Sequence, residues 1–208
     1  LAAVFLLNML APWPASASKQ TPTPQAVIKE TVVKLGNAFN DEGSEGTLYR
    51  DPDNPTRINR ELGRIEGGKV IKVFDKMGAT DEASVREMVR INEQLRAGGA
   101  PLVKMEAVKL EDGRWGVRME EIIGTNLGDV RDHGLDPAVI RRLEAEAAKL
   151  LNEIDSKTNG LADRRGNLHG GPEDFRNFIV VRDADGGFKI NNVDPLNMKK
   201  VVKLEPNS

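Results

Sequence analysis

Acidic, amide and lysine side chains supply most of the chemistry that this sequence can offer. The chain of 208 residues contains no cysteine and only two histidines. A disulfide framework, a thiolate zinc site and a cysteine nucleophile are therefore excluded, and two histidines are too few for a His-rich metal site. The charges nearly balance, with 30 basic against 32 acidic side chains. Nucleic-acid-binding proteins need a basic excess or a basic stripe, so this class is not expected.

The densest group of such residues lies between His169 and Pro195. The turn sequence Asp185-Gly186-Gly187 separates two apolar runs and predicts a β-hairpin, which brings its two ends together. Oxygen ligands at these ends would suit Mg²⁺, which is usually shared with substrate phosphates. The alternative is a pair of Asx turns with local hydrogen bonds. The acids and amides at the two ends are Glu173, Asp174, Asn177, Asn192 and Asp194.

A lysine interrupts the apolar, β-branched run 69–74, which predicts a strand. Alternation puts Lys72 on the same face as Val70, where its ammonium needs an anionic partner. Glu87, on a helix predicted to follow, could provide this partner, although it lies at the edge of the helix's apolar stripe and Glu93 competes with it. The alternative is an edge strand whose lysine points to water.

A glycine-rich segment, Gly43-Ser44-Glu45-Gly46, precedes that strand. Glycine has no Cβ, so backbone N–H groups in such a loop can approach phosphate oxygens closely. The segment is therefore a candidate phosphate-binding loop, and an ordinary Gly-Ser turn is the alternative.

These residues must be positioned by an α+β fold in two lobes. The order of the expected elements gives an antiparallel sheet with one inserted helix, followed by a mostly helical half. The polar stretch 51–68 is rich in turn residues, and 27–35 is expected to form a strand or a short helix. The other strands are expected at 69–74, 103–110, 115–122, 178–181 and 188–190.

Two helices have clear start signals. The first is expected to begin at Thr80 or Asp81 and to end at the glycines 98–99. The second is expected over 136–155, because Asp136 can cap a helix and Pro137 suits its first position.

The N-terminus forms a separate unit. Residues 1–17 contain an apolar run that is too short to span a bilayer, followed by the small-residue site Ala15-Ser16-Ala17. This pattern predicts a signal peptide, with an artificial extension or a packed hydrophobic helix as the alternatives. Residues 18–26 are expected to form a Ser/Thr/Pro-rich linker. No later segment is apolar enough to cross a membrane, so a secreted protein is expected.

The order of these features resembles the protein kinase superfamily. A glycine-rich loop, a strand lysine, a helix glutamate, an acidic loop, a hairpin and a second acid follow one another as in that family. Residues 119–127 resemble the kinase hinge, which would join an N-lobe over 27–122 to a C-lobe over 123–208. The implied fold is a compact two-lobed kinase-like domain with a truncated helical C-lobe.

The resemblance also implies how ATP would bind. Backbone amides of Gly43-Ser44-Glu45-Gly46 would cover the phosphates, and Lys72, held by Glu87, would contact the α- and β-phosphates. Backbone groups from Glu120 to Ile122 would take the adenine.

The resemblance assigns catalysis and metal binding to the acidic residues between His169 and Pro195. Asp174 would accept the proton of a substrate hydroxyl, while Asn177 and Asp194 would hold Mg²⁺. The family places its catalytic Asp two residues after a His or Tyr and five before an Asn. Here Gly171 stands at that spacing from His169, and Asp174 is three residues before Asn177.

The short stretch after the hairpin leaves little room for an activation segment. This resembles the minimal kinases that bacterial type III secretion delivers into host cells, in which a Glu-Asp pair precedes the strand and an Asn-Asp-Pro-like stretch follows it. Glu173-Asp174 and residues 192–195 match that version. A signal peptide does not fit type III export, so the delivery route stays open.

We therefore expect a secreted, monomeric minimal kinase that binds ATP and Mg²⁺ and phosphorylates a protein target, possibly in a host cell, on Ser or Thr rather than Tyr. Neither a nucleic-acid partner nor a membrane span is expected. The main alternative is a pseudokinase that binds a partner protein, because both acidic motifs are off register. A third hypothesis is a secreted binding domain whose resemblance to kinases is coincidental.

Overall fold

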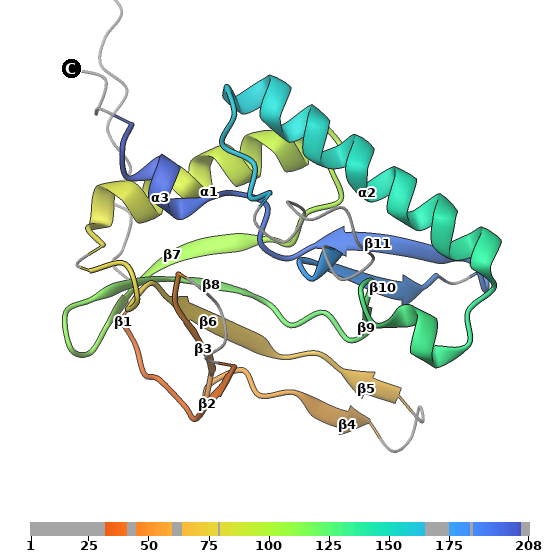
Figure 1. Ribbon diagram of the computed structural model, residues 1–208. Helices are drawn as coiled ribbons and strands as arrows, with labels where there is room; N and C mark the ends of the chain where they lie inside the picture. The colour runs from red at the N-terminus through yellow and green to blue at the C-terminus, as the bar shows by residue number, and fades with distance from the viewer. Residues whose placement is uncertain are drawn as a thin grey trace, which may run out of the picture.

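The computed structural model describes residues 32–40, 45–59, 64–78, 80–164, 175–183 and 185–204 (Figure 1). The expected signal peptide, the linker and several site residues, namely Gly43, Ser44, Glu173 and Asp174, lie outside these ranges. The strands are β1 (Val32–Val33), β2 (Ala38–Asn40), β3 (Thr47–Arg50), β4 (Arg57–Asn59), β5 (Arg64–Glu66), β6 (Lys69–Val73), β7 (Met105–Leu110), β8 (Trp115–Glu120), β9 (Thr125–Asn126), β10 (Phe178–Arg182) and β11 (Phe188–Asn192). The helices are α1 (Glu82–Ala97), a 3₁₀ turn at Val130–His133, α2 (Pro137–Thr158) and α3 (Met198–Val201).

The larger sheet has the strand order β1-β7-β8-β6-β3-β2. Strand β6 lies inside it and pairs antiparallel with β3 on one side and β8 on the other. Lys72 lies opposite Leu48 of β3 and Val117 of β8. An interior strand exposes neither edge to water, which excludes the edge-strand alternative for this lysine.

Helix α1 covers one face of this sheet and lies between β6 and β7 in the chain (Figure 1). The Asp81 carboxylate accepts a hydrogen bond from Ser84 N at 2.7 Å, and Gly98 ends the helix, so both expected boundaries are confirmed. The residues that α1 buries follow the helical period: Val85, Met88, Ile91, Asn92 and Leu95.

The second part of the molecule consists of a small antiparallel sheet, in the order β11-β10-β9, and helix α2, which runs beside it (Figure 1). The expected hairpin is confirmed, with Val180 opposite Ile190. Asp136 caps α2 through a bond from Ala138 N at 2.6 Å, and Pro137 takes the first helical position, as expected.

One apolar core joins the two parts, because a single cluster contains buried side chains such as Phe74, Met88, Leu143 and Phe178. A two-stranded sheet, β4–β5, extends from the larger sheet within a stretch that the sequence indicated only as turns. After β11, the described residues contain one further helix, the four-residue α3. No helix in the described part of the chain is long and apolar enough to span a bilayer.

The fold class is therefore α+β, as the sequence predicted. A curled antiparallel sheet carries one inserted helix, and a connecting segment leads to a smaller part with few helices.

Candidate functional site

A cleft of about 320 Å³ opens between the two parts of the molecule. Its residues come from the beginning of β3, from β6, from the end of β8 and the segment after it, and from the two ends of the β10–β11 hairpin. The apolar lining consists of Leu48, Val70, Met119, Ile122, Ile179 and Val193. The polar side chains of the lining are Lys72, Glu120, Glu121, Asn126, Arg176, Asn177 and Asp194.

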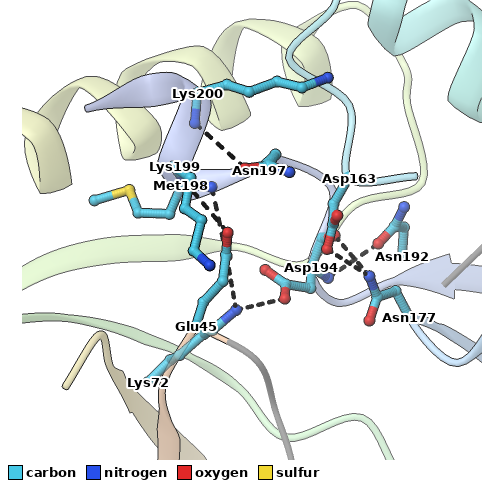
Figure 2. A network of polar contacts seen from close by, with 10 residues as sticks. All are labelled: Glu45, Lys72, Asp163, Asn177, Asn192, Asp194, Asn197, Met198, Lys199 and Lys200. Atoms are coloured by element: carbon cyan, nitrogen blue, oxygen red, sulfur yellow. Dashed lines mark hydrogen bonds and ion pairs between the residues drawn. The ribbon is translucent and has the colours of Figure 1, made fainter. Parts of the chain in front are cut away.

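Lys72 is the cation at the inner end of this cleft. It is 7% exposed and extends from the same face of β6 as Val70 and Phe74, with Nζ 5.2 Å from the centre of the Phe74 ring. Its Nζ donates a hydrogen bond to Asp194 Oδ2 and lies 3.8 Å from Glu45 Oε2 (Figure 2). The expectation that a buried lysine needs an anionic partner is thus met by two carboxylates.

Glu87 is not one of these partners, so the predicted Lys72–Glu87 pair is wrong. The Glu87 carboxylate accepts two hydrogen bonds from Arg90, both at 2.6 Å. Three of the α1 residues around it, Val85, Met88 and Ile91, face the core, and Glu87 itself is turned toward the outer side of the helix. Burying the apolar stripe of α1 fixes the rotation of the helix and carries Glu87 away from the lysine. The hydrogen bonds from Arg90 lower the pKa of Glu87.

Glu45 lies at the start of the described segment that leads into β3. It is 3% exposed, and its carboxylate accepts hydrogen bonds from the backbone N–H groups of Met198 and Lys199, each at 3.4 Å. The next residue, Gly46, passes so close to β6 that a Cβ there would lie 1.9 Å from the carbonyl oxygen of Val73. Glycine is therefore required at 46 for close approach of two backbones, and the side chain of Glu45 is directed inward toward Lys72 (Figure 2).

The two predicted metal ligands, Asn177 and Asp194, lie together at the base of the hairpin (Figure 2). Asn177 Nδ2 lies 3.3 Å from the carbonyl oxygen of Asp194 and 3.3 Å from Asp163 Oδ2. Asp194 Oδ1 is buried and has no hydrogen-bond partner among the described residues. The hairpin has thus brought its two ends together, as the turn signal predicted.

These oxygen atoms fit a magnesium ion. A carboxylate oxygen without a partner, an adjacent amide and a second carboxylate are hard donors, and Mg²⁺ usually needs only one or two protein carboxylates besides substrate phosphates. No group of three or more His, Cys, Asp or Glu side chains forms a complete cage among the described residues. The donor set is therefore suited to a metal that arrives with a phosphate ligand.

Asn192, the other candidate at this end of the hairpin, is fully buried. Its Oδ1 accepts a hydrogen bond from the backbone N–H of Asp194 at 2.9 Å. Asn192 therefore orients the turn that presents Asp194 to the cleft.

Burial raises the pKa of Asp194, and the charges of Asp163 and Glu45 raise it further, while Lys72 acts in the opposite direction. Lys72 is therefore the group that favours the ionised form of this carboxylate, beside two other acids of the described chain. The result is a cluster in which a single ammonium links a carboxylate of the hairpin to a carboxylate next to β3.

Glu120 and Ile122 also line the cleft, at the end of β8 and in the segment that leaves it. The position of this segment is fixed by Glu121, whose N–H donates to Gly68 O at 2.9 Å and whose carboxylate accepts from Arg50 Nη1 at 2.7 Å. Its backbone is thus held along one wall of the cleft by the larger sheet.

Asp163 is a site residue that sequence analysis missed. It is 7% exposed, follows α2, and its backbone N–H donates to Pro195 O at 3.0 Å, directly after Asp194. No local motif marks it, because its position depends on pairing between segments that are distant in sequence. The predicted residues Gly43, Ser44 and Asp174 lie outside the described residues.

No protein-family model and no curated protein matches this sequence. Among solved structures, the crystal structure of a double mutant of the Mycobacterium tuberculosis PknI kinase domain is similar to this chain, with a TM-score of 0.46 and 15% sequence identity. The match covers 83% of this chain and 62% of that one. The chain thus spans less than two thirds of the length of the kinase domain that it matches.

Proposed function

We propose that the cleft binds ATP together with Mg²⁺ and that the protein transfers the γ-phosphoryl group to a hydroxyl of a target protein. One observation carries the proposal. A buried lysine on an interior strand contacts an acid at the base of a hairpin, in a cleft that is also lined by apolar side chains. Outside a ligand site, a buried charge cluster of this kind is expensive to keep, so its position in a cleft favours a role in binding.

The two ends of the cleft suit the two ends of ATP. The apolar side chains of Leu48, Val70 and Met119 offer a dry slot for the adenine ring, beside the backbone of residues 120–122. At the inner end, Lys72 offers a fixed positive charge to the phosphates. Gly46, which also lines the cleft, has no side chain, so its backbone can lie close to β6.

Asn177 and Asp194 would hold the metal, with Asp194 Oδ1 as the free donor. Bound Mg²⁺ neutralises charge on the phosphate oxygens during transfer. Lys72 would keep Asp194 ionised and would hold the phosphates in one orientation. Most of the rate enhancement would then come from positioning and from charge stabilisation rather than from strong base chemistry.

In the transfer step, the hydroxyl oxygen of the target forms a bond to the γ-phosphorus while the bond between that phosphorus and the β–γ bridging oxygen breaks. ADP leaves, and the hydroxyl proton moves to a carboxylate. Asp174 is the base that the resemblance to kinases implies, and Asp163 is the carboxylate that the structure places beside Asn177.

Transfer of labelled phosphate from ATP in the presence of Mg²⁺ tests the proposal, with autophosphorylation and a cell lysate as acceptors. If Asp174 is the base, Asp174→Ala loses about 100-fold or more in transfer rate, within the range for general bases, while Mg·ATP still binds. Asp163→Ala is the matched comparison, and the larger loss identifies the base. Normal transfer in both variants would contradict an Asp base at either position.

The pseudokinase remains the second candidate, and the off-register spacing of Asp174 and Asn177 favours it. It predicts Mg·ATP binding without phosphate transfer to any protein of the lysate.

We further propose that the protein is secreted as a monomer, with cleavage after Ala17. Mass spectrometry of secreted protein tests this, since a chain that still carries residues 1–17 would contradict it.

A further inference from the structure

Glu45 links three parts of the molecule. Its carboxylate lies 3.8 Å from Lys72 Nζ in β6 and accepts backbone hydrogen bonds from Met198 and Lys199 at the start of α3. It is 3% exposed, although it lies only two residues before the start of β3. A glutamate in such a position would normally extend into water, so its burial beside a lysine indicates a specific role.

Lys72 needs a carboxylate other than Asp194 if the site is to bind a metal. The Asp194 carboxylate would have two roles. Its Oδ2 accepts a hydrogen bond from Lys72, and its Oδ1 is the oxygen that could bind a metal. A cation at Oδ1 would compete for the charge of this carboxylate and weaken its hold on the lysine. A second, independently anchored carboxylate would then keep the ammonium in place.

Helix α1 offers no such carboxylate among the described residues. Each of its three glutamates in the described chain pairs with an arginine of the same helix: Glu82 with Arg86, Glu87 with Arg90 and Glu93 with Arg96. The polar residue on its buried face is Asn92, whose Nδ2 donates to Val103 O at 2.9 Å. The helix is therefore connected to the rest of the molecule by apolar packing, by the Asn92 amide and by Arg96, whose Nε donates to Leu102 O at 3.2 Å.

We propose that Glu45 is the positioning residue for Lys72, in place of a carboxylate from the helix. The backbone N–H groups of Met198 and Lys199 hold the Glu45 carboxylate, and this carboxylate in turn holds the lysine toward the cleft. The inference rests on the proposed nucleotide-binding function, and it makes α3 part of the support of the site. Glu45 thereby acts through its side chain, whereas the resemblance to kinases implied only its backbone amide.

The test compares Glu45→Gln with Glu87→Gln in the full chain. Glutamine keeps one oxygen that can accept one of the two bonds from α3, and it replaces the other acceptor oxygen by NH₂ while removing the charge beside Lys72. The first readout needs no nucleotide: the acylation rate of Lys72 Nζ by an acetyl succinimidyl ester, followed by peptide mass spectrometry. The second readout is the dissociation constant of Mg·ATP. Glu87→Gln is the matched control, because the Glu87 carboxylate pairs with Arg90 on the same helix and not with Lys72.

Glu45→Gln is expected to increase the acylation of Lys72 severalfold, because the amine is held by one carboxylate instead of two. It is also expected to weaken Mg·ATP binding about tenfold, which corresponds to about 1.4 kcal/mol. Glu87→Gln should change neither readout.

Unchanged Lys72 acylation in Glu45→Gln overturns the inference. Tighter Mg·ATP binding also overturns it, because Glu45 would then compete with the phosphates. If the wild-type protein does not bind Mg·ATP, the proposed function fails while the acylation readout still decides the role of Glu45. If Glu45→Gln fails to fold, Glu45→Asp is used instead. Aspartate keeps the charge but is shorter by one methylene, so its carboxylate lies farther from Lys72. Lys72 acylation should again rise.

Discussion

Basic and acidic side chains pair both in the cluster around Lys72 and on the outer side of α1. The first environment is buried and the second is exposed to water. In the cluster, Lys72 contacts carboxylates that follow it by 122 residues and precede it by 27. On α1, arginines pair with glutamates three or four residues away, and the Glu87 and Arg90 side chains are 34% and 54% exposed. Sequence spacing therefore identifies the exposed pairs, which contribute little to stability. The buried pairs, which contribute most, form between residues that are distant in sequence.

The energetic difference between these two environments is large. An exposed ion pair contributes between about 0 and 1 kcal/mol, because water already solvates both charges. Removing one partner from a buried pair costs about 3–5 kcal/mol, because the remaining charge is left without solvent or partner. The buried cluster is thus where substitutions should affect both stability and ligand binding.

Lys72→Met should produce the largest loss of stability, about 3 kcal/mol at neutral pH. Burial raises the pKa of Asp194, and this substitution also removes the lysine that opposes the rise. A carboxylate whose folded-state pKa is raised destabilises the fold above that pKa, and the lost stability returns as the pH falls through it. Urea unfolding of wild type and variant between about pH 4 and pH 8 measures this. A deficit that is equal at all these pH values would contradict it.

Asp194→Asn should have an intermediate effect, which is measured on the metal dependence of ATP binding. The amide oxygen can still accept from Lys72, but the metal loses a charged donor. We expect Mg·ATP to bind about tenfold more weakly, and metal-free ATP to bind as in wild type, because second-shell and ligand changes typically act on this scale. Calorimetric titrations with and without Mg²⁺ measure both. If Asp194→Asn leaves the Mg²⁺ dependence unchanged, Asp194 is not a ligand, and Asn192 would have to be reconsidered.

Glu87→Gln should have the smallest effect, a loss of about 0.5 kcal/mol or less. The bonds from Arg90 lower the pKa of Glu87 below its ordinary value of 4.5. A carboxylate whose pKa is lowered in the folded state stabilises the fold at pH values above its ordinary pKa. This contribution is lost as the pH falls through the lowered pKa. The difference between wild type and variant should therefore be present at pH 7 and disappear in acid. A loss of several kcal/mol in the same unfolding experiment would show that Glu87 belongs to a buried network after all.

Much of the framework could be predicted because its signals are local. Asp81 and Asp136 cap the helices at the positions that their sequences indicate, and Asp185-Gly186-Gly187 marks the turn of the hairpin. The β-branched run around Lys72 likewise predicts a strand, and alternation gives the correct face.

The partners of Lys72 could not be predicted, because they depend on long-range packing. Rotation of α1 about its axis follows from burying its apolar stripe, and this moves Glu87 away from the cleft. Glu45 reaches the lysine only because Gly46 lets the backbone cross β6 at close range. Asp163 joins the site through pairing of its segment with residues 195–197, which leaves no trace in the local sequence.

The central claim is that Lys72 and Asp194 mark an ATP–Mg²⁺ site, and titration of Mg·ATP into wild type and Lys72→Met tests it most directly. We expect the wild-type protein to bind with a dissociation constant between about 1 μM and 1 mM, the usual range for enzyme substrates. Binding should depend on Mg²⁺ and should be lost in Lys72→Met, with Arg90→Met as a control that binds like wild type. Absence of binding by the wild-type protein, or equal binding by Lys72→Met, would contradict the account.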